Sequence, residues 1–361
     1  MIRPDLAKQY VTWREIMAQP RLWSHWAKAF DVAQLRDWLH SLAFDEVWFC
    51  GAGTSAFIGD ILVAGLGDQS IWPLRSIPST DLVARPKHFL NGSKQPLVVN
   101  FGRSGNSAES LGTLDALEVL APKAPRLNIT CNPDGALATR KSEGPHHTIV
   151  LPEETHDAGF AMTSSFTTMF LTALSIFDPK FDMIKGAAAL SEAFEQALPA
   201  MVKSAHASTP DRVVFLGAGA LSYAAREAAL KTLELSAGQI PVLWDSPLGF
   251  RHGPKSFVTD ETLIVIFLSC EAHARLYDLD LVSELDSQFP NSHILTVGEA
   301  GMINLTGLSS DLEQAILCVA FAQVASVLWS DQLGMAVDNP FEGQGTLTRV
   351  VADVRLHGVR S

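Results

Sequence analysis

Few cysteines occur in this sequence: Cys50, Cys131, Cys270 and Cys318 are the only four among 361 residues. They stand singly within apolar runs, with no CxxC pair and no histidine at metal-ligand spacing, so we expect neither a structural metal site nor a disulfide framework. A run of roughly 18 apolar residues, the length of a membrane span, is also lacking. The opening stretch MIRPDLAKQY holds no apolar signal core. We therefore expect a cytoplasmic protein with reduced, buried thiols.

Basic residues are in short supply. The sequence has 27 Lys and Arg against 39 Asp and Glu, a formal net charge of −12. Nucleic acid favours clustered Lys and Arg, and no such cluster appears, so neither nucleic acid nor a membrane is expected as a partner. A bound anion would have to be held locally, by backbone amides and helix N-termini.

The length favours two α/β lobes over a single core. Widely spaced tryptophan and leucine residues over 1–44 predict a helical arm that is broken at Pro20. Beyond it, the run EVWFCGAGT at 46–54 is echoed by RVVFLGAGA at 212–220, which indicates an internal repeat. Each unit reads strand, Gly turn, helix, strand. This pattern predicts two tandem doubly wound lobes with central parallel sheets.

The stretch SAHASTPD is the most polar, turn-like segment between the two units, and it suggests the boundary between the lobes. We place the first lobe at 45–203, the second lobe at 204–340 and a C-terminal tail at 341–361.

Two turns rich in glycine and hydroxyl groups follow predicted strands of the first lobe, GAGTSAFIGD at 51–60 and GRSGNSAES at 102–110. In open parallel sheets, ligands bind at the carboxyl ends of the strands, where both turns lie. The first turn alone could be a nucleotide-binding turn or only a tight connection. Neither turn has a GxGxxG fingerprint or a GxxxxGK[ST] loop, and the pair together favours a phosphate.

These motifs resemble those of a known protein family. The chain is similar to the sugar isomerase (SIS) superfamily, and within it to the tagatose-6-phosphate ketose/aldose isomerase family, whose characterised members act as galactosamine-6-phosphate deaminase-isomerases. The similar stretches, in order, are GAGTSAFIGDIL (51–62), FGRSGNSAES (101–110), ITCN (129–132), ETHDAGFAMTSSFTTM (154–169), AAREAALKTLELSAG (224–238), DSPLGFRHGPKS (245–256) and LTRVV (347–351).

The resemblance implies an enzyme that needs no metal or cofactor, binds a sugar phosphate, and forms a homodimer or a higher homo-oligomer with a shared active site. It assigns the phosphate and the substrate to residues in the two turns, which are Gly53, Thr54, Ser55, Arg103, Ser104, Gly105, Asn106 and Ser107. Compared with the isomerase domain of glucosamine-6-phosphate synthase, Gly102 replaces a serine and Arg103 replaces a glutamine. The phosphate is thus expected to bind Ser55, Ser104 and Ser107, with Arg103 as an additional contact.

The resemblance assigns the catalytic roles to Glu234 and His252. Glu234 matches the glutamate that moves a proton between C1 and C2 of the open-chain sugar, although a helix-face carboxylate is more often simply solvated. His252, in FRHGPKS, matches the histidine that opens the sugar ring, from the same subunit or a neighbouring one. The flanking Arg251 and Lys255 could attract a phosphate or be surface charges.

The segment THDAGFAMTSSFTTM at 155–169 is the third part of the implied site. The resemblance puts Met162, Thr163 and Ser164 beside C1 and C2, whereas the residues alone are equally compatible with a cap of the following helix. His156 and Asp157 are candidates without a defined role. Arg349 matches a basic residue in a tail that folds over the site, although an arginine near a C-terminus is otherwise just solvated.

The expected reaction is the conversion of an amino-sugar 6-phosphate, galactosamine 6-phosphate or glucosamine 6-phosphate, to the ketose 6-phosphate and ammonia. No N-terminal glutaminase cysteine precedes the arm, so ammonia release is the expected direction. Two alternatives stay open: aldose-ketose isomerisation of a neutral hexose phosphate, and a regulator that only binds a sugar phosphate. The arm shows no clear helix-turn-helix, which disfavours the regulator.

Overall fold

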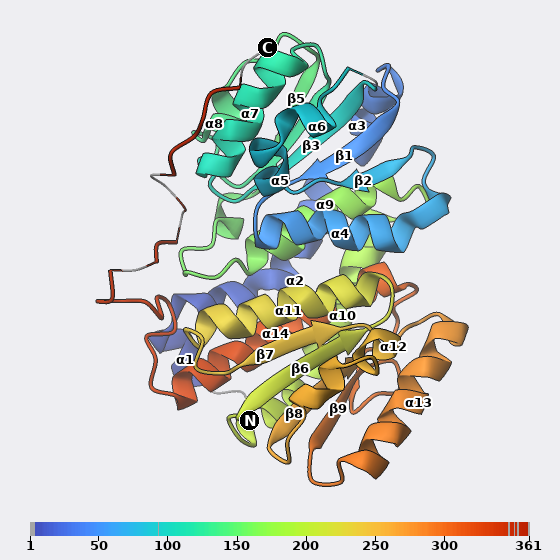
Figure 1. Cartoon of the computed structure of the whole chain (residues 1–361), viewed down its shortest axis with the longest axis vertical. Coiled ribbons are helices and arrows are strands. Elements are labelled where there is room, and N and C mark those ends of the chain that lie inside the picture. Colours follow the sequence, from blue (N-terminus) through green and yellow to red (C-terminus); the bar gives the residue numbers. More distant parts are fainter. Residues whose placement is uncertain (1–3, 93, 346, 350, 352–353, 360–361) are drawn as a thin grey trace.

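The computed structural model describes residues 4–92, 94–345, 347–349, 351 and 354–359, so the start of the predicted arm and part of the predicted tail lie outside the described residues (Figure 1). Two five-stranded parallel sheets, each flanked by helices, lie at opposite ends of the molecule (Figure 1). The predicted pair of α/β lobes with parallel sheets is therefore confirmed.

The first sheet has the strand order β2-β1-β3-β4-β5. All five residues of the interior strand β1 are buried, as expected for a parallel strand covered on both faces. Its strands are β1 Glu46–Cys50, β2 Leu74–Ser76, β3 Pro96–Gly102, β4 Arg126–Thr130 and β5 His146–Val150. Its helices are α4 Thr54–Leu66, η1 Gly67–Gln69, α5 Ser79–Ala84, α6 Pro86–Phe89, α7 Ala108–Leu120, α8 Ala136–Thr139, η2 Glu153–Thr155 and α9 Ser164–Phe177.

The second sheet has the order β10-β9-β8-β6-β7, the order of the first sheet when read from the other end. Its strands are β6 Arg212–Gly217, β7 Val242–Asp245, β8 Thr262–Phe267, β9 His293–Gly298 and β10 Ile303–Asn304. Its helices are α11 Ala220–Leu235, α12 Pro247–Phe250, η3 Pro254–Phe257, α13 Ala272–Gln288 and α14 Asp311–Gln332. α10, Met183–His206, precedes the sheet, and the predicted lobe boundary at 203/204 falls in its last turn.

A layer of helices separates the two sheets, and α2 of the N-terminal segment belongs to it (Figure 1). The segment forms α1 Pro4–Gln9, α2 Val11–Ala29 and α3 Val32–His40, and α2 packs against α9, α10 and α14. The indole of Trp23 is buried there and donates to Thr167 Oγ1 at 3.1 Å. The predicted helical arm is thus confirmed, and one face of α2 is buried in the core.

The predicted break at Pro20 is wrong, because α2 continues through it to Ala29. A proline within a helix leaves the carbonyl four residues earlier without its amide donor. Here that carbonyl belongs to Ile16, and the side chain of Gln19 donates to it at 3.1 Å. This local replacement lets the helix pass the proline.

A carboxylate from the other end of the chain caps α2. Tyr10, the N-cap residue, makes no capping hydrogen bond with its side chain. Asp338 instead accepts from the amides of Val11 and Thr12 at 2.9 and 2.8 Å and from Thr12 Oγ1 at 2.7 Å. The beginning of α2 is therefore held by a residue that follows α14.

α14 is long and apolar enough to cross a membrane by length and composition alone, with a mean hydropathy of 1.6. It is buried inside the fold, where it packs on α10 and α11. Of the four cysteines, Cys50, Cys131 and Cys318 are buried as expected, whereas Cys270 is only half-buried.

Candidate active site

A cavity of about 670 Å³ opens at the carboxyl end of the first sheet. Segments from both lobes line it: the β1–α4 and β3–α7 turns, residues 160 and 162, the last turns of α11, and parts of the C-terminal segment. The predicted site residues that line it are Gly53, Thr54, Ser55, Arg103, Ser104, Gly105, Ser107, Met162, Glu234 and Arg349. Asn106, Thr163, Ser164 and His252 are outside its lining.

The β1–α4 turn brings backbone and hydroxyl groups to the cavity wall. A Cβ on Gly51 would lie 2.6 Å from the carbonyl of Ser55, and Gly53 has φ +55°, so both positions favour glycine. Thr54 and Ser55 then open α4, whose N-terminal amides and partial positive charge favour an anion.

The β3–α7 turn supplies a second set of hydroxyl groups. Ser107 caps α7 by accepting from the amide of Ser110 at 3.2 Å, and the two hydroxyl groups lie 2.9 Å apart. Ser104 Oγ accepts from the amide of Asn106 at 3.2 Å. The Asn106 side chain turns to the amide of Ala136, at 2.8 Å, and so fixes the turn from outside the cavity.

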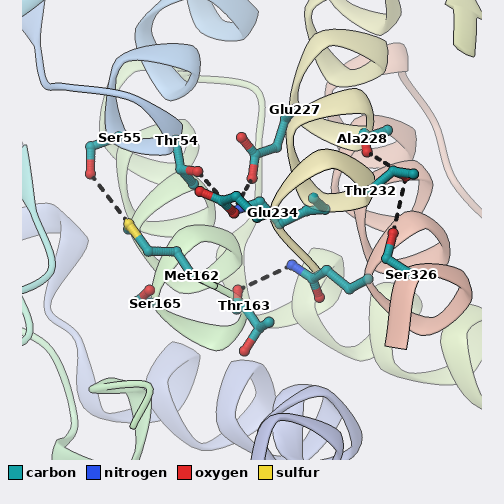
Figure 2. Close-up of polar contacts among 12 residues, drawn as sticks. Thr54, Ser55, Met162, Thr163, Ser165, Glu227, Ala228, Thr232, Glu234 and Ser326 are labelled. Atoms are coloured by element: carbon teal, nitrogen blue, oxygen red, sulfur yellow. Dashed lines mark hydrogen bonds and ion pairs between the residues drawn. The ribbon is translucent and has the colours of Figure 1, made fainter. Parts of the chain in front are cut away.

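A row of three charged side chains on α11 contains the predicted base. Lys231 Nζ lies 2.5 Å from Glu234 Oε2, 3.4 Å from Glu227 Oε1 and 3.0 Å from Thr54 Oγ1. Glu227 and Lys231 are fully buried, whereas the Glu234 side chain is 25% exposed and faces the cavity. Figure 2 shows Thr54, Glu227 and Glu234 converging between the two lobes. Glu234 is therefore not a solvated surface carboxylate.

The surroundings shift the protonation of this row. Burial raises the pKa of Glu227 to about 7, with the ammonium of Lys231 acting in the opposite direction. For Lys231, burial lowers the pKa, but the two carboxylates outweigh it and the net direction is upward. We conclude that Lys231 stays charged and that Glu227 exchanges its proton near neutral pH.

Glu227 and Lys231 are not among the residues that the sequence predicted for the site. The signal was available, since Glu227, Lys231 and Glu234 are spaced i, i+4, i+7 and hence lie on one helix face. The spacing does not reveal that α4 packs on this face and buries two of the three charges.

The loop before α9 does not direct its hydroxyl groups at the cavity. Asp157, 1% exposed, accepts from the amides and from the hydroxyl groups of Thr163, Ser164 and Ser165, six hydrogen bonds of 2.5 to 3.0 Å. The carboxylate thus caps α9 from outside the helix. The hydroxyl groups of Thr163 and Ser164, predicted to bind the substrate, donate to Asp157 in this structure, whereas Met162 lines the cavity.

Arg103 reaches the cavity wall but directs its guanidinium group at main-chain carbonyls. Nη1 donates to Gly159 and Phe160, both at 3.3 Å, and Nη2 donates to Arg349 at 3.0 Å. The side chain is 6% exposed, and burial lowers its pKa. Three of the donors expected to meet a phosphate therefore bond the protein's own main chain.

His252 is exposed on the second lobe, between α12 and η3. Its neighbours Arg251 and Lys255 both pair with Glu284 of α13, the former at 2.7 Å, so these cations are surface ion pairs. Among the described residues, no group of three or more His, Cys, Asp or Glu side chains is placed to hold a metal ion.

Two α/β lobes with a hydroxyl-lined cradle at the strand ends and a carboxylate from a facing helix define a protein of the sugar-isomerase class. Residues 45–177 match the SIS domain model. D-galactosamine-6-phosphate deaminase AgaS of Escherichia coli is 38% identical over 96% of both chains. The protein of that name from Shewanella sp. (strain ANA-3) is 36% identical over 96% of this chain and 91% of its own.

A solved structure agrees with these relatives. The crystal structure of tagatose-6-phosphate ketose/aldose isomerase from Escherichia coli superposes with a TM-score of 0.85 at 36% identity, covering 92% of this chain and 96% of that chain. The chain belongs to the SIS domain family, in the group whose curated members are named D-galactosamine-6-phosphate deaminase AgaS. The family resemblance of the sequence is thereby confirmed.

Proposed function

We propose that the chain is an enzyme that converts an amino-sugar 6-phosphate, galactosamine 6-phosphate before glucosamine 6-phosphate, to the ketose 6-phosphate and ammonia. One observation carries the proposal. Glu234 faces the same cavity as the two hydroxyl-bearing turns of the first lobe. A phosphate held by the turns would bring the other end of an open-chain sugar toward that carboxylate.

The proposed binding mode uses local donors, because the chain as a whole is acidic. Ser55, Ser104 and Ser107 offer hydroxyl groups, and the N-termini of α4 and α7 offer amides. Arg349, whose side chain bonds the carbonyl of Asp157, closes the cavity from the C-terminal segment.

The proposed chemistry is a proton transfer followed by hydrolysis. After ring opening, Glu234 takes the proton from C2 and O1 gains a proton, which gives an enolamine. A proton is then delivered to C1 while the nitrogen loses one, which gives the ketose imine. Water adds to the imine carbon, the carbon–nitrogen bond breaks, and ketose 6-phosphate and ammonia leave. Lys231, 2.5 Å from Glu234, fixes the carboxylate that moves the proton.

The test is a coupled assay of ammonium release with galactosamine 6-phosphate and glucosamine 6-phosphate in parallel. Glu234→Gln should abolish turnover while calorimetry still detects substrate binding, because the substitution removes basicity and keeps shape. Glu192→Gln, on the exposed face of α10, is the matched control and should retain activity. Full activity of Glu234→Gln would remove Glu234 from the role of base.

A second candidate is aldose-ketose isomerisation of a neutral hexose phosphate, which uses the same proton transfer with oxygen in place of nitrogen. It is favoured by the structural relative, whose name is tagatose-6-phosphate ketose/aldose isomerase. Turnover of tagatose 6-phosphate without ammonium release from either amino sugar would establish this reaction and rule out the deaminase.

We also propose a homo-oligomer in the cytoplasm, with His252 supplied across a subunit interface for ring opening. In support, His252 is exposed and lies outside the cavity of its own chain. Glu234→Gln and His252→Gln should each be inactive alone. When the two are co-expressed, mixed dimers should regain about a quarter of the wild-type activity, since half the dimers are mixed and each has one intact site. Absence of any regain would refute a shared site.

A further inference from the structure

Arg103 connects three segments that are far apart in the chain. In the described part of the structure, its guanidinium hydrogen bonds all end on main-chain carbonyls, those of Gly159 and Phe160 before α9 and that of Arg349 in the C-terminal segment. Arg103 itself belongs to the β3–α7 turn. One buried side chain therefore joins this turn to a loop and to the C-terminal segment.

The same segments are joined by further contacts. The guanidinium group of Arg349 donates to the carbonyl of Asp157, two residues before Gly159. The amide of Ala108, at the start of α7, donates to the carbonyl of Val351 at 3.3 Å. The C-terminal segment is thus attached both at Arg349 and at Val351.

The joined segments carry the apolar wall of the cavity. Phe160 and Phe341 both line it, and their rings lie 5.0 Å apart at 49°. Leu347 and Thr348 line it as well. The loop and the C-terminal segment together therefore form this side of the cavity.

A guanidinium group can hydrogen-bond carbonyls of several segments at once, which an ammonium group does less well. Its planar fork of N–H donors can serve several carbonyls at once, whereas lysine presents a single nitrogen. Charge-assisted hydrogen bonds are stronger than neutral ones, which offsets the desolvation of the buried cation. Arg103 directs three hydrogen bonds, from both of its terminal nitrogens, at main-chain carbonyls.

We infer that Arg103 is a positioning residue, which holds the 159–162 loop and the C-terminal segment against the sugar phosphate and is not itself a phosphate ligand. The inference rests on the proposed function in one respect, that the cavity binds a sugar phosphate. The attachment of the C-terminal segment can be measured without substrate or turnover.

The first experiment is limited proteolysis with chymotrypsin, scored by mass spectrometry for cleavage after Leu347 and Phe341. Arg103→Lys keeps the charge but not the fork, so cleavage should be roughly tenfold faster than in the wild type, the change expected on losing at least one charge-assisted hydrogen bond. Arg140→Lys is the matched control, because Arg140 pairs with Asp115 and Glu118 away from the cavity. Equal cleavage of wild type and Arg103→Lys would overturn the inference.

The second experiment separates positioning from direct contact with phosphate. Arg103→Ala should raise KM for the sugar phosphate about tenfold or more, on the same energetic basis, while the inhibition constant of inorganic phosphate stays within about twofold. A parallel rise of both constants would make Arg103 a phosphate ligand and overturn the inference.

The third arm uses a chain that ends at Gln344 and so lacks the segment that Arg103 holds. In this background Arg103→Lys should raise KM by a smaller factor than it does in the full chain, because the truncation has already removed the carbonyl of Arg349 and leaves only those of Gly159 and Phe160. Additive effects would contradict the inference. If no sugar phosphate is turned over at all, the proposed function fails, and the proteolysis result still decides the role of Arg103.

Discussion

The buried carboxylate of Glu227 makes a quantitative prediction about stability and pH. Its pKa in the fold, about 7, exceeds the ordinary value of 4.5 mainly because of burial. A raised pKa means that the folded state holds the proton more tightly than the unfolded chain does. The stability gained from this is fully present below pH 4.5 and is lost as the pH rises through 7.

Glu227→Gln removes the titration while keeping the shape of the side chain. The difference between about 7 and 4.5, at about 1.36 kcal/mol per pH unit, gives roughly 3 kcal/mol as the upper bound of the effect. We expect the stability of Glu227→Gln relative to wild type to improve by about 2 kcal/mol between pH 5 and pH 8. Any constant packing penalty of the glutamine cancels in this comparison.

The assay is urea denaturation at pH 5, 6, 7 and 8, monitored by tryptophan fluorescence. Four tryptophans are buried, Trp23 and Trp329 among them, so the fluorescence should change on unfolding. Taking the difference between variant and wild type removes the contributions of other titrating groups such as Glu15. Glu192→Gln, an exposed carboxyl, should give a flat difference. A flat difference for Glu227→Gln as well would refute the reasoning and show that Lys231 keeps Glu227 ionised over the whole range.

Two further predictions concern the turns and the loop. Ser104→Ala with Ser107→Ala should chiefly raise KM, because each lost hydrogen bond to a charged phosphate is worth roughly 1.5–3 kcal/mol, and an unchanged KM in steady-state kinetics would place the phosphate elsewhere. Asp157→Asn should lower the free energy of unfolding by about 2–4 kcal/mol, because an amide nitrogen would face donors that now meet a carboxylate, and an unaltered melting temperature would contradict this. Asp134→Asn, which changes an exposed carboxylate, is the control for Asp157→Asn.

Features governed by neighbouring residues could be predicted from the sequence. The two cradle turns are examples, since the strand before each turn and the helix after it are both visible as local patterns, and Gly53 supplies the left-handed backbone that the first turn requires. The parallel order of the strands followed from the same alternation of strand and helix.

Features that depend on a distant partner could not be predicted. Thr163 and Ser164 had the composition of a substrate-binding loop, but the carboxylate of Asp157 folds back onto them. The burial of Lys231 depends on Thr54, which lies 177 positions earlier in the chain. Pro20 is tolerated because Gln19 bonds a single carbonyl, a detail that residue type alone does not disclose.

The capping of α2 by Asp338 has a consequence for biosynthesis. The two ends of this contact are 326 and 327 positions apart, so α2 receives its cap only after α14 has left the ribosome. Such distant contacts slow folding and leave apolar surface exposed for longer. During translation, the tryptophan-bearing face of α2 stays exposed until α10 and α14 have been synthesised. We therefore expect the nascent chain to bind chaperones.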